Sequence, residues 1–158
     1  MKLFNKSVSS ILIEVIFEAN KKKQDSSVSK TVKIFSSENS LLKIKIEQII
    51  ISLLYVHNIR YEIIILGIIY IDRLILTNQI RLTVDNVVEY LLICIAFSLK
   101  HNQDYYDLSG ILSHSSILKF DYSYFEFRTL IILDYKLFVT AETFELYDNN
   151  IGRHSRKL

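Results

Sequence analysis

LTVDNVVEYLLICIAFSLK, residues 82–100, is the stretch that says most about how this chain folds. Within it, residues 90–99 read YLLICIAFSL, and a helical wheel of this run has no polar face. A helix that is apolar all round is buried on every side. Thr83 is predicted to cap the helix by accepting from the amide of Asn86, and Lys100 places a cation at its negative C-terminal end. The pattern predicts a central helix enclosed by others.

More helices are predicted on both sides of this central segment. Strand is the competing interpretation of the isoleucine-rich runs, but these runs exceed strand length and lack period-two alternation. The architecture is therefore predicted to be all-α, with about five core helices and an N-terminal flanking helix. The predicted helices, besides the central one, are residues 7–20, about 41–56 (starting at Ser40 or Leu41), 61–76, 121–135 and 141–149, with a short helix near 105–109 that Gly110 caps.

Two polar, basic stretches flank the core helices. KKKQDSSVSKTVK, residues 21–33, is interpreted as a solvated loop, with a docking role for its lysines as the alternative. The ending IGRHSRKL, residues 151–158, is interpreted as a frayed basic tail, with a nuclear-import patch as the alternative. A length of 158 residues fits one domain.

Composition argues against several classes of function. The net charge of +2 is mild and the basic residues are scattered, so no nucleic-acid partner is expected. The most hydrophobic window, residues 63–71, is much shorter than the roughly 20 residues that a membrane span needs, so no membrane partner is expected. The single cysteine, and an N-terminus that makes a poor signal peptide, favour an intracellular protein of the cytoplasm, the nucleus or both.

Local signatures of catalysis are missing. The four histidines have no metal-ligand spacing, and the three glycines cannot form a phosphate-binding loop. Cys94 lies mid-helix among apolar residues, where a thiol stays protonated and inert. The chain is therefore expected not to be an enzyme and to use no metal, cofactor or small-molecule substrate.

A few charges lie on apolar helices. Asp72 follows Ile65, Ile68 and Ile69 at helical spacing, which points its side chain toward the core. Because an unpartnered buried carboxylate is costly, a basic partner is expected, with Lys43 and Lys45 as candidates. Lys100 and Glu126 read as surface charges from spacing alone. The aromatic residues dense between 105 and 127 suit either core packing or a partner surface.

Three segments in order resemble the cyclin box, in particular the single-box, phosphate-starvation-type cyclins. They are LGIIYIDRL (66–74), LTVDN leading into the apolar helix and Lys100, and YFEFRTLIILDYKLFV (124–139). The stretch from Phe35 to Ile46 is similar to the entry of the first box helix in that subgroup. The resemblance covers roughly residues 8–148. It implies a single five-helix box whose third helix is central, in residues 40–150, preceded by an N-terminal helix and basic loop in residues 1–39 and followed by a tail in residues 151–158.

The resemblance also implies a function. Cyclins are non-catalytic and activate a cyclin-dependent protein kinase by packing against its mobile αC helix, whose glutamate then pairs with the ATP-positioning lysine. The kinase-contacting lysine and glutamate of the family correspond to Lys100 and Glu126, and its buried aspartate corresponds to Asp72, with Lys43 as the nearest match to the arginine partner. The expected partner is therefore a cyclin-dependent kinase.

Several positions depart from the family pattern. Val88 and Glu89 stand where a His-Arg pair is common, His101 replaces an aromatic residue, and Ser123 replaces an asparagine. These departures fit an alternative function, a cyclin-fold protein–protein adaptor that does not activate a kinase. A helical domain that holds an apolar ligand or a membrane surface is a third interpretation.

Overall fold

The computed structural model describes residues 4, 6, 8–10 and 31–155 of the chain. In this part all regular structure is helical and there are no strands, which confirms the predicted all-α class. After a helical N-terminal segment that includes residues 8–10, the helices in chain order are α2 (Thr31–Tyr55), α3 (Tyr61–Leu76), α4 (Val87–Asn102), α5 (Ser109–Leu118), α6 (Tyr122–Ile132) and α7 (Ala141–Ser155).

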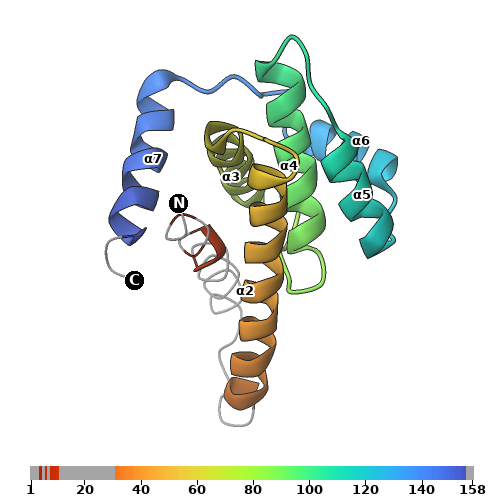
Figure 1. Cartoon of the computed structure of the whole chain (residues 1–158), viewed down its shortest axis with the longest axis vertical. Helices are drawn as coiled ribbons and strands as arrows, with labels where there is room; N and C mark the ends of the chain where they lie inside the picture. The colour runs from red at the N-terminus through yellow and green to blue at the C-terminus, as the bar shows by residue number, and fades with distance from the viewer. Residues whose placement is uncertain (1–3, 5, 7, 11–30, 156–158) are drawn as a thin grey trace.

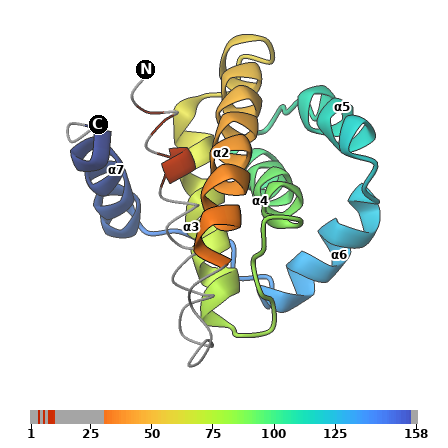
Figure 2. The same ribbon diagram turned by 90° about the horizontal axis from the view of Figure 1, so that it is seen from below.

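Helix α4 lies at the centre of the molecule. Figure 2 shows it enclosed by α2, α3, α5 and α6, while α7 lies outside α3 on the far side (Figure 1). Every residue from Val87 to Leu99 is buried except Glu89. The prediction of a central helix buried on all sides is therefore confirmed, and it follows from the absence of any polar face in YLLICIAFSL.

Helices α3 and α4 approach each other closely at Gly67. A Cβ atom at this position would lie 2.8 Å from Cγ1 and 3.2 Å from the backbone nitrogen of Ile95. Any larger residue would have to push the two helices apart. Gly67 therefore fixes the spacing of the two helices that carry most of the core.

The start of α4 differs from the predicted cap. Its N-cap is Asn86, and the Asn86 side chain accepts from the amide of Thr83 at 2.8 Å, the reverse of the predicted bond. Both residue types are good caps, so the choice depends on the preceding turn, where the side-chain NH₂ group of Asn86 also donates to the carbonyl of Arg81 at 3.0 Å. The helix consequently begins four residues later than Thr83.

Helix α3 has the predicted bounds, whereas α2 is longer than predicted. It begins at Thr31 rather than near residue 40, so residues 31–33 of the predicted basic loop are helical. The segment TVKIFSSENS is polar but contains neither proline nor glycine, so nothing in it breaks a helix. Helix α2 ends as predicted near His57, with Asn58 in the left-handed conformation (φ 53°).

The region after α4 departs most from prediction. The short helix expected at 105–109 is absent, and α5 instead begins at Ser109, where Asp107 accepts from both the amide and the hydroxyl of Ser109 at 2.7 Å. Gly110 therefore lies in the first turn of α5 rather than at a C-terminal cap. It packs against His57, whose Cγ would lie 2.5 Å from a Cβ placed there.

The last two helices have shifted ends. Helix α6 stops at Ile132 instead of residue 135, because Asp134 and Tyr135 adopt positive φ angles of 52° and 57°. Helix α7 continues to Ser155, so most of the predicted frayed tail is helical, and Ile151 within it is buried. Helices α2 and α7 thus run through the predicted domain boundaries at residues 39/40 and 150/151.

The predicted N-terminal helix falls outside the described residues apart from residues 8–10, which are helical. Residues 21–30 of the predicted loop and residues 156–158 of the tail also lie outside them. In the part of the chain that the structure describes, no helix combines the length and the apolar character needed to cross a membrane.

Candidate functional site

The fold brings Lys100 and Glu126 together, although 26 residues separate them in sequence. Lys100 stands in the last turn of α4 and Glu126 in the middle of α6, and the ammonium group forms an ion pair with Oε1 of the carboxylate. Their side chains are 33% and 24% exposed. The pair is therefore neither buried in the core nor fully solvated, and it remains accessible from outside.

Tyr122, one turn before Glu126 on α6, completes this cluster. Its hydroxyl donates to Glu126 Oε1 at 2.9 Å, and its ring centroid lies 5.7 Å from the Lys100 ammonium nitrogen. Burial, together with the hydrogen bond to Glu126 and the charge of that carboxylate, raises the pKa of the Tyr122 hydroxyl well above its usual range. The phenol thus stays protonated and holds the carboxylate in place, and both the hydroxyl and the lysine contact the same oxygen, Oε1.

The Lys100–Glu126 pair lies at the edge of a hollow with a volume of about 390 Å³. Helix α4, helix α6 and the segment that follows α6 surround this hollow, and apolar side chains form most of its wall. We call it the α4–α6 hollow; its lining residues are Phe97, Lys100, His101, Ser123, Glu126, Phe127, Leu130 and Leu137.

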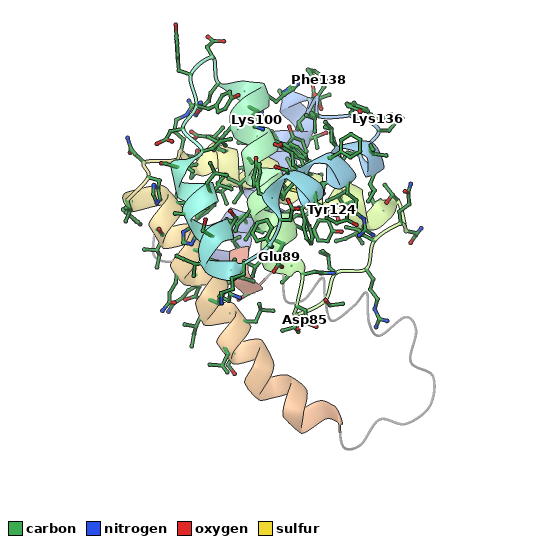
Figure 3. The ribbon with its side chains drawn as sticks, turned by 90° about the vertical axis from the view of Figure 1, so that its right-hand side faces the viewer. Asp85, Glu89, Lys100, Tyr124, Lys136 and Phe138 are labelled. Carbon is green, nitrogen blue, oxygen red and sulfur yellow. The ribbon has the colours of Figure 1, made fainter. Side chains whose placement is uncertain are left out.

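Large apolar side chains are exposed next to the α4–α6 hollow. Along α6, Tyr124, Phe127 and Ile131 are 55%, 65% and 49% exposed. They follow one another at three- and four-residue spacing and so form one face of the helix. Figure 3 shows this side of the molecule, with Lys100 near the end of α4 and Tyr124 on α6. Exposed aromatic side chains beside a polar pair are typical of protein–protein binding surfaces.

A second hollow, of about 890 Å³, adjoins the first and shares His101 and Leu137 with it. Its wall includes residues 132–138, which run from the end of α6 toward α7. Three side-chain hydrogen bonds from α3 hold this segment. Arg73 donates to the carbonyls of Lys136 (2.7 Å) and Phe138 (2.9 Å), and Tyr70 donates to that of Leu137 (2.7 Å). The shape of both hollows therefore depends on α3 as well as on α4 and α6.

Asp72 does not have the partner that was predicted for it. Its carboxylate accepts from the hydroxyl of Tyr147 on α7 at 2.5 Å, and neither Lys43 nor Lys45 is paired with it. Asp72 is half-buried rather than buried. Its carboxylate is therefore only partly desolvated, and a hydrogen bond from a neutral hydroxyl is enough to stabilise it without a cation. Burial, with the hydrogen bond and the charge of Asp72, raises the pKa of Tyr147. The contact joins α3 to α7, on the side of α3 away from the Lys100–Glu126 pair.

The positions that depart from the family pattern fall into two groups. His101 and Ser123 line the α4–α6 hollow. Val88 and Glu89 lie in the first turn of α4, at the opposite end from Lys100, as the labels for Glu89 and Lys100 show in Figure 3. Val88 is buried, and Oε2 of Glu89 is buried with no hydrogen-bond partner among the described residues. Only the first group can therefore touch a molecule bound in the hollow.

Tyr122 and Tyr147 were missed by reasoning from the sequence. Tyr122 had a usable signal, since it stands four residues before Glu126 on a predicted helix and such pairs lie on one face. Tyr147 had none, because 75 residues separate it from Asp72. As predicted, Cys94 is buried, and burial raises the pKa of its thiol. In residues 31–155 and the described N-terminal positions, no group of three or more His, Cys, Asp or Glu side chains is placed to hold a metal ion.

No model of a known protein family matches the chain. No curated protein matches its sequence, and no solved structure matches its fold, at a significant level.

Proposed function

We propose that this protein is the non-catalytic regulatory subunit of a cyclin-dependent protein kinase, which it binds and activates by packing against the αC helix of the kinase. One observation supports this function above the others: Lys100 and Glu126, the two positions that the cyclin resemblance implies for kinase contact, form an ion pair at the edge of an apolar hollow. Spacing in the sequence alone gave no reason for these residues to meet.

The chemistry of the pair suits the contact that the resemblance implies. A lysine ammonium has three donors, and an ionised carboxylate has several lone pairs, so each group has hydrogen-bonding capacity beyond their mutual bond. A carbonyl of the kinase backbone would accept from Lys100, and a backbone N–H would donate to Glu126. Tyr122 keeps Glu126 oriented for this contact through its 2.9 Å hydrogen bond.

The apolar surroundings supply the other requirement for binding a helix. An amphipathic helix is recognised by a hydrophobic groove into which its apolar side chains insert. The α4–α6 hollow, together with exposed Phe127 and Ile131, offers such a surface beside the polar pair. Packing there would hold the kinase αC helix in the position in which its glutamate pairs with the ATP-positioning lysine, which is the step that activates the kinase.

A pull-down from cell lysate, followed by mass spectrometry, tests this proposal. The bait proteins are the wild type, the double variant Lys100→Ala/Glu126→Ala, and the control Asp134→Ala/Lys136→Ala. The control removes a second ion pair (2.9 Å, both side chains 76% exposed) that does not line the α4–α6 hollow. We expect a cyclin-dependent kinase to bind the wild type and the control but not the Lys100/Glu126 variant.

Other outcomes are equally informative. A kinase that binds all three proteins alike would contradict the assignment of Lys100 and Glu126 but keep the partner. A kinase lost only from the Asp134/Lys136 variant would move the binding surface to the second hollow. Reproducible recovery of other proteins, with no kinase, would favour the adaptor function.

A further inference from the structure

Two histidines meet where α5 packs against the end of α2. His57 follows α2 and His114 lies on α5, and their imidazole rings are edge to face with centroids 6.5 Å apart. Nε2 of His114 lies 3.2 Å from the hydroxyl oxygen of Ser52 on α2. The His57 ring also packs against Gly110 of α5, as described above. We call Ser52, His57, Gly110 and His114 the histidine cluster.

Helix α5 buries little apolar surface of its own. Its buried residues are Gly110, Ile111 and Ser115, and only Ile111 among them has a large apolar side chain. Leu112 and Ile117 of the same helix are 44% and 73% exposed. Elements with few buried apolar contacts open locally at a low cost in free energy, so α5 can leave its place while the rest of the core stays folded. The contacts of the histidine cluster therefore weigh heavily in holding α5 against α2.

The position of His114 favours its neutral form. Both histidine side chains are half-buried. Burial, together with the positive charge of His57, lowers the pKa of His114 below the usual value of about 6.5. A neutral His114 meets His57 as one aromatic ring meets another, whereas a protonated His114 would place a second cation beside it. The contact with Ser52 does not decide between the two forms, because a hydroxyl can pair with either.

Charged groups come close to the histidine cluster from the turn before α5. Asp107 lies near enough to His57 for their charges to attract, and hydrogen bonds from Ser109, together with this attraction, hold the pKa of the Asp107 carboxyl below its usual range. The other charged residues of the neighbouring segments are Glu47 on α2, Arg60 after His57, Glu89, Lys100 and His101 on α4, and Lys119 after α5. Among the described residues, the charge that lowers the pKa of His114 is that of His57. A proton added to His114 therefore meets repulsion from its neighbour.

We propose that the histidine cluster is a pH-sensitive latch, which holds α5 against α2 while His114 is neutral and releases α5 when His114 takes up a proton. Release exposes His114 to water, where its pKa returns to about 6.5. Below that pH the open form binds a proton that the closed form resists, so the open form gains population as the pH falls. At neutral and alkaline pH the latch stays closed.

This inference is independent of kinase binding. His57 and His114 lie at the junction of α2 and α5, and neither of them lines the α4–α6 hollow. The latch is a property of the free protein and can be tested without a partner, so either proposal can fail without the other.

NMR of the purified full-length protein tests the protonation step. The ring resonances of the histidines are followed from about pH 8 to about pH 4.5 and assigned with the variants His57→Gln and His114→Gln. We expect the pKa of His114 to lie below its usual value of about 6.5 and to rise in His57→Gln, which removes the neighbouring charge. Circular dichroism checks that both variants keep the helical content of the wild type. A His114 that titrates at or above its usual value, or that titrates alike in the wild type and His57→Gln, would overturn the role of the histidine cluster.

Hydrogen exchange measured by mass spectrometry tests the release of α5. Protection of the amides of residues 109–118, corrected for the intrinsic pH dependence of exchange, is compared at about pH 7.5 and about pH 5.5. In the wild type we expect the protection of α5 to fall by up to about tenfold at the lower pH, the most that one proton with an open-state pKa near 6.5 can cause, while that of α3 changes little.

Two variants show whether His114 causes this change in protection. His114→Gln should show no such fall, whereas Ser116→Ala, at an exposed position on the same helix, should show it as the wild type does. Protection of α5 that is equal at both pH values in the wild type, or that falls as much in His114→Gln, would overturn the proposal.

Discussion

Two polar contacts between helices, Lys100–Glu126 and Asp72–Tyr147, have opposite relations to the surface. The first joins α4 to α6 beside an open apolar hollow. Both charged side chains line this hollow, where another molecule could contact them. The second joins α3 to α7 through one short, partly buried hydrogen bond. A polar contact beside an open apolar surface suits recognition, whereas one that only ties two helices together suits stability.

The largest expected effect that separates the two contacts is on binding. Lys100→Ala/Glu126→Ala should weaken the affinity for the kinase by about 2–5 kcal/mol, the usual cost of removing hydrogen-bonded interface charges. The thermal midpoint should change little, because the pair is partly exposed and such pairs add little stability. Titration calorimetry with the kinase, and thermal denaturation of the free protein, measure the two effects. A large loss of stability without a loss of affinity would reverse the roles assigned to the two contacts.

The reverse pattern is expected for the second contact. Asp72→Ala should lower the free energy of unfolding by about 1–3 kcal/mol, because the Tyr147 hydroxyl loses its acceptor in a half-buried position. Tyr147→Phe should have an effect in the same range, and neither variant should change kinase affinity. Chemical denaturation of each variant provides the measurement. Lys43→Ala is the control, since Lys43 does not contact Asp72, and a comparable loss in that variant would contradict the pairing.

A smaller effect is expected from Tyr122→Phe. This change removes the hydroxyl that donates to Glu126 but keeps the ring beneath Lys100. Kinase affinity should fall by about 0.5–1.5 kcal/mol, the net value of one hydrogen bond. Tyr105→Phe, at a side chain 95% exposed, is the matched control. An unchanged affinity in Tyr122→Phe would show that Glu126 is held well enough by Lys100 alone.

The smallest effect is a difference in alkaline stability. Tyr122 and Tyr147 have pKa values raised above the ordinary value of about 10. Above pH about 10, the unfolded chain releases these phenol protons while the folded chain keeps them, so the free energy of unfolding falls as pH rises. Tyr147→Phe should make this fall shallower. Urea denaturation at several alkaline pH values would measure the slopes, and equal slopes in the wild type and Tyr147→Phe would contradict the raised pKa of Tyr147.

The helices were predicted correctly where the hydrophobic pattern is compatible with only one structure. The uniform hydrophobicity of residues 90–99 could be satisfied only by a helix buried on all sides, and α3 has the predicted bounds. The prediction failed at the cap of α4, since Thr83 and Asn86 are both good caps and only the preceding turn decides between them. It failed again after α4, where serine-rich α5 has little apolar periodicity and begins at the turn that Asp107 forms with Ser109.

The candidate site was predictable only in part, because its geometry depends on how distant helices pack together. Nothing in local spacing indicated that Lys100 and Glu126 would meet; their pairing depends on how α6 packs across α4, and the two residues were chosen from the cyclin resemblance. The partner of Asp72 depends on where α7 docks against α3, which no local pattern encodes, so the predicted partners, Lys43 and Lys45, were wrong. The exposure of Phe127 and Ile131, and the hollow beside them, are likewise properties of the packed helices.

Kinase activation itself is tested by measuring phosphate transfer. The kinase recovered in the pull-down is supplied with labelled ATP and a protein substrate, alone, with the wild type, and with Lys100→Ala/Glu126→Ala at the same concentration. The wild type is expected to raise the rate of transfer well above that of the kinase alone, and the double variant is expected to leave it near that level. A wild type that binds the kinase without raising the rate, or a double variant that raises it as much as the wild type, would contradict activation through this surface.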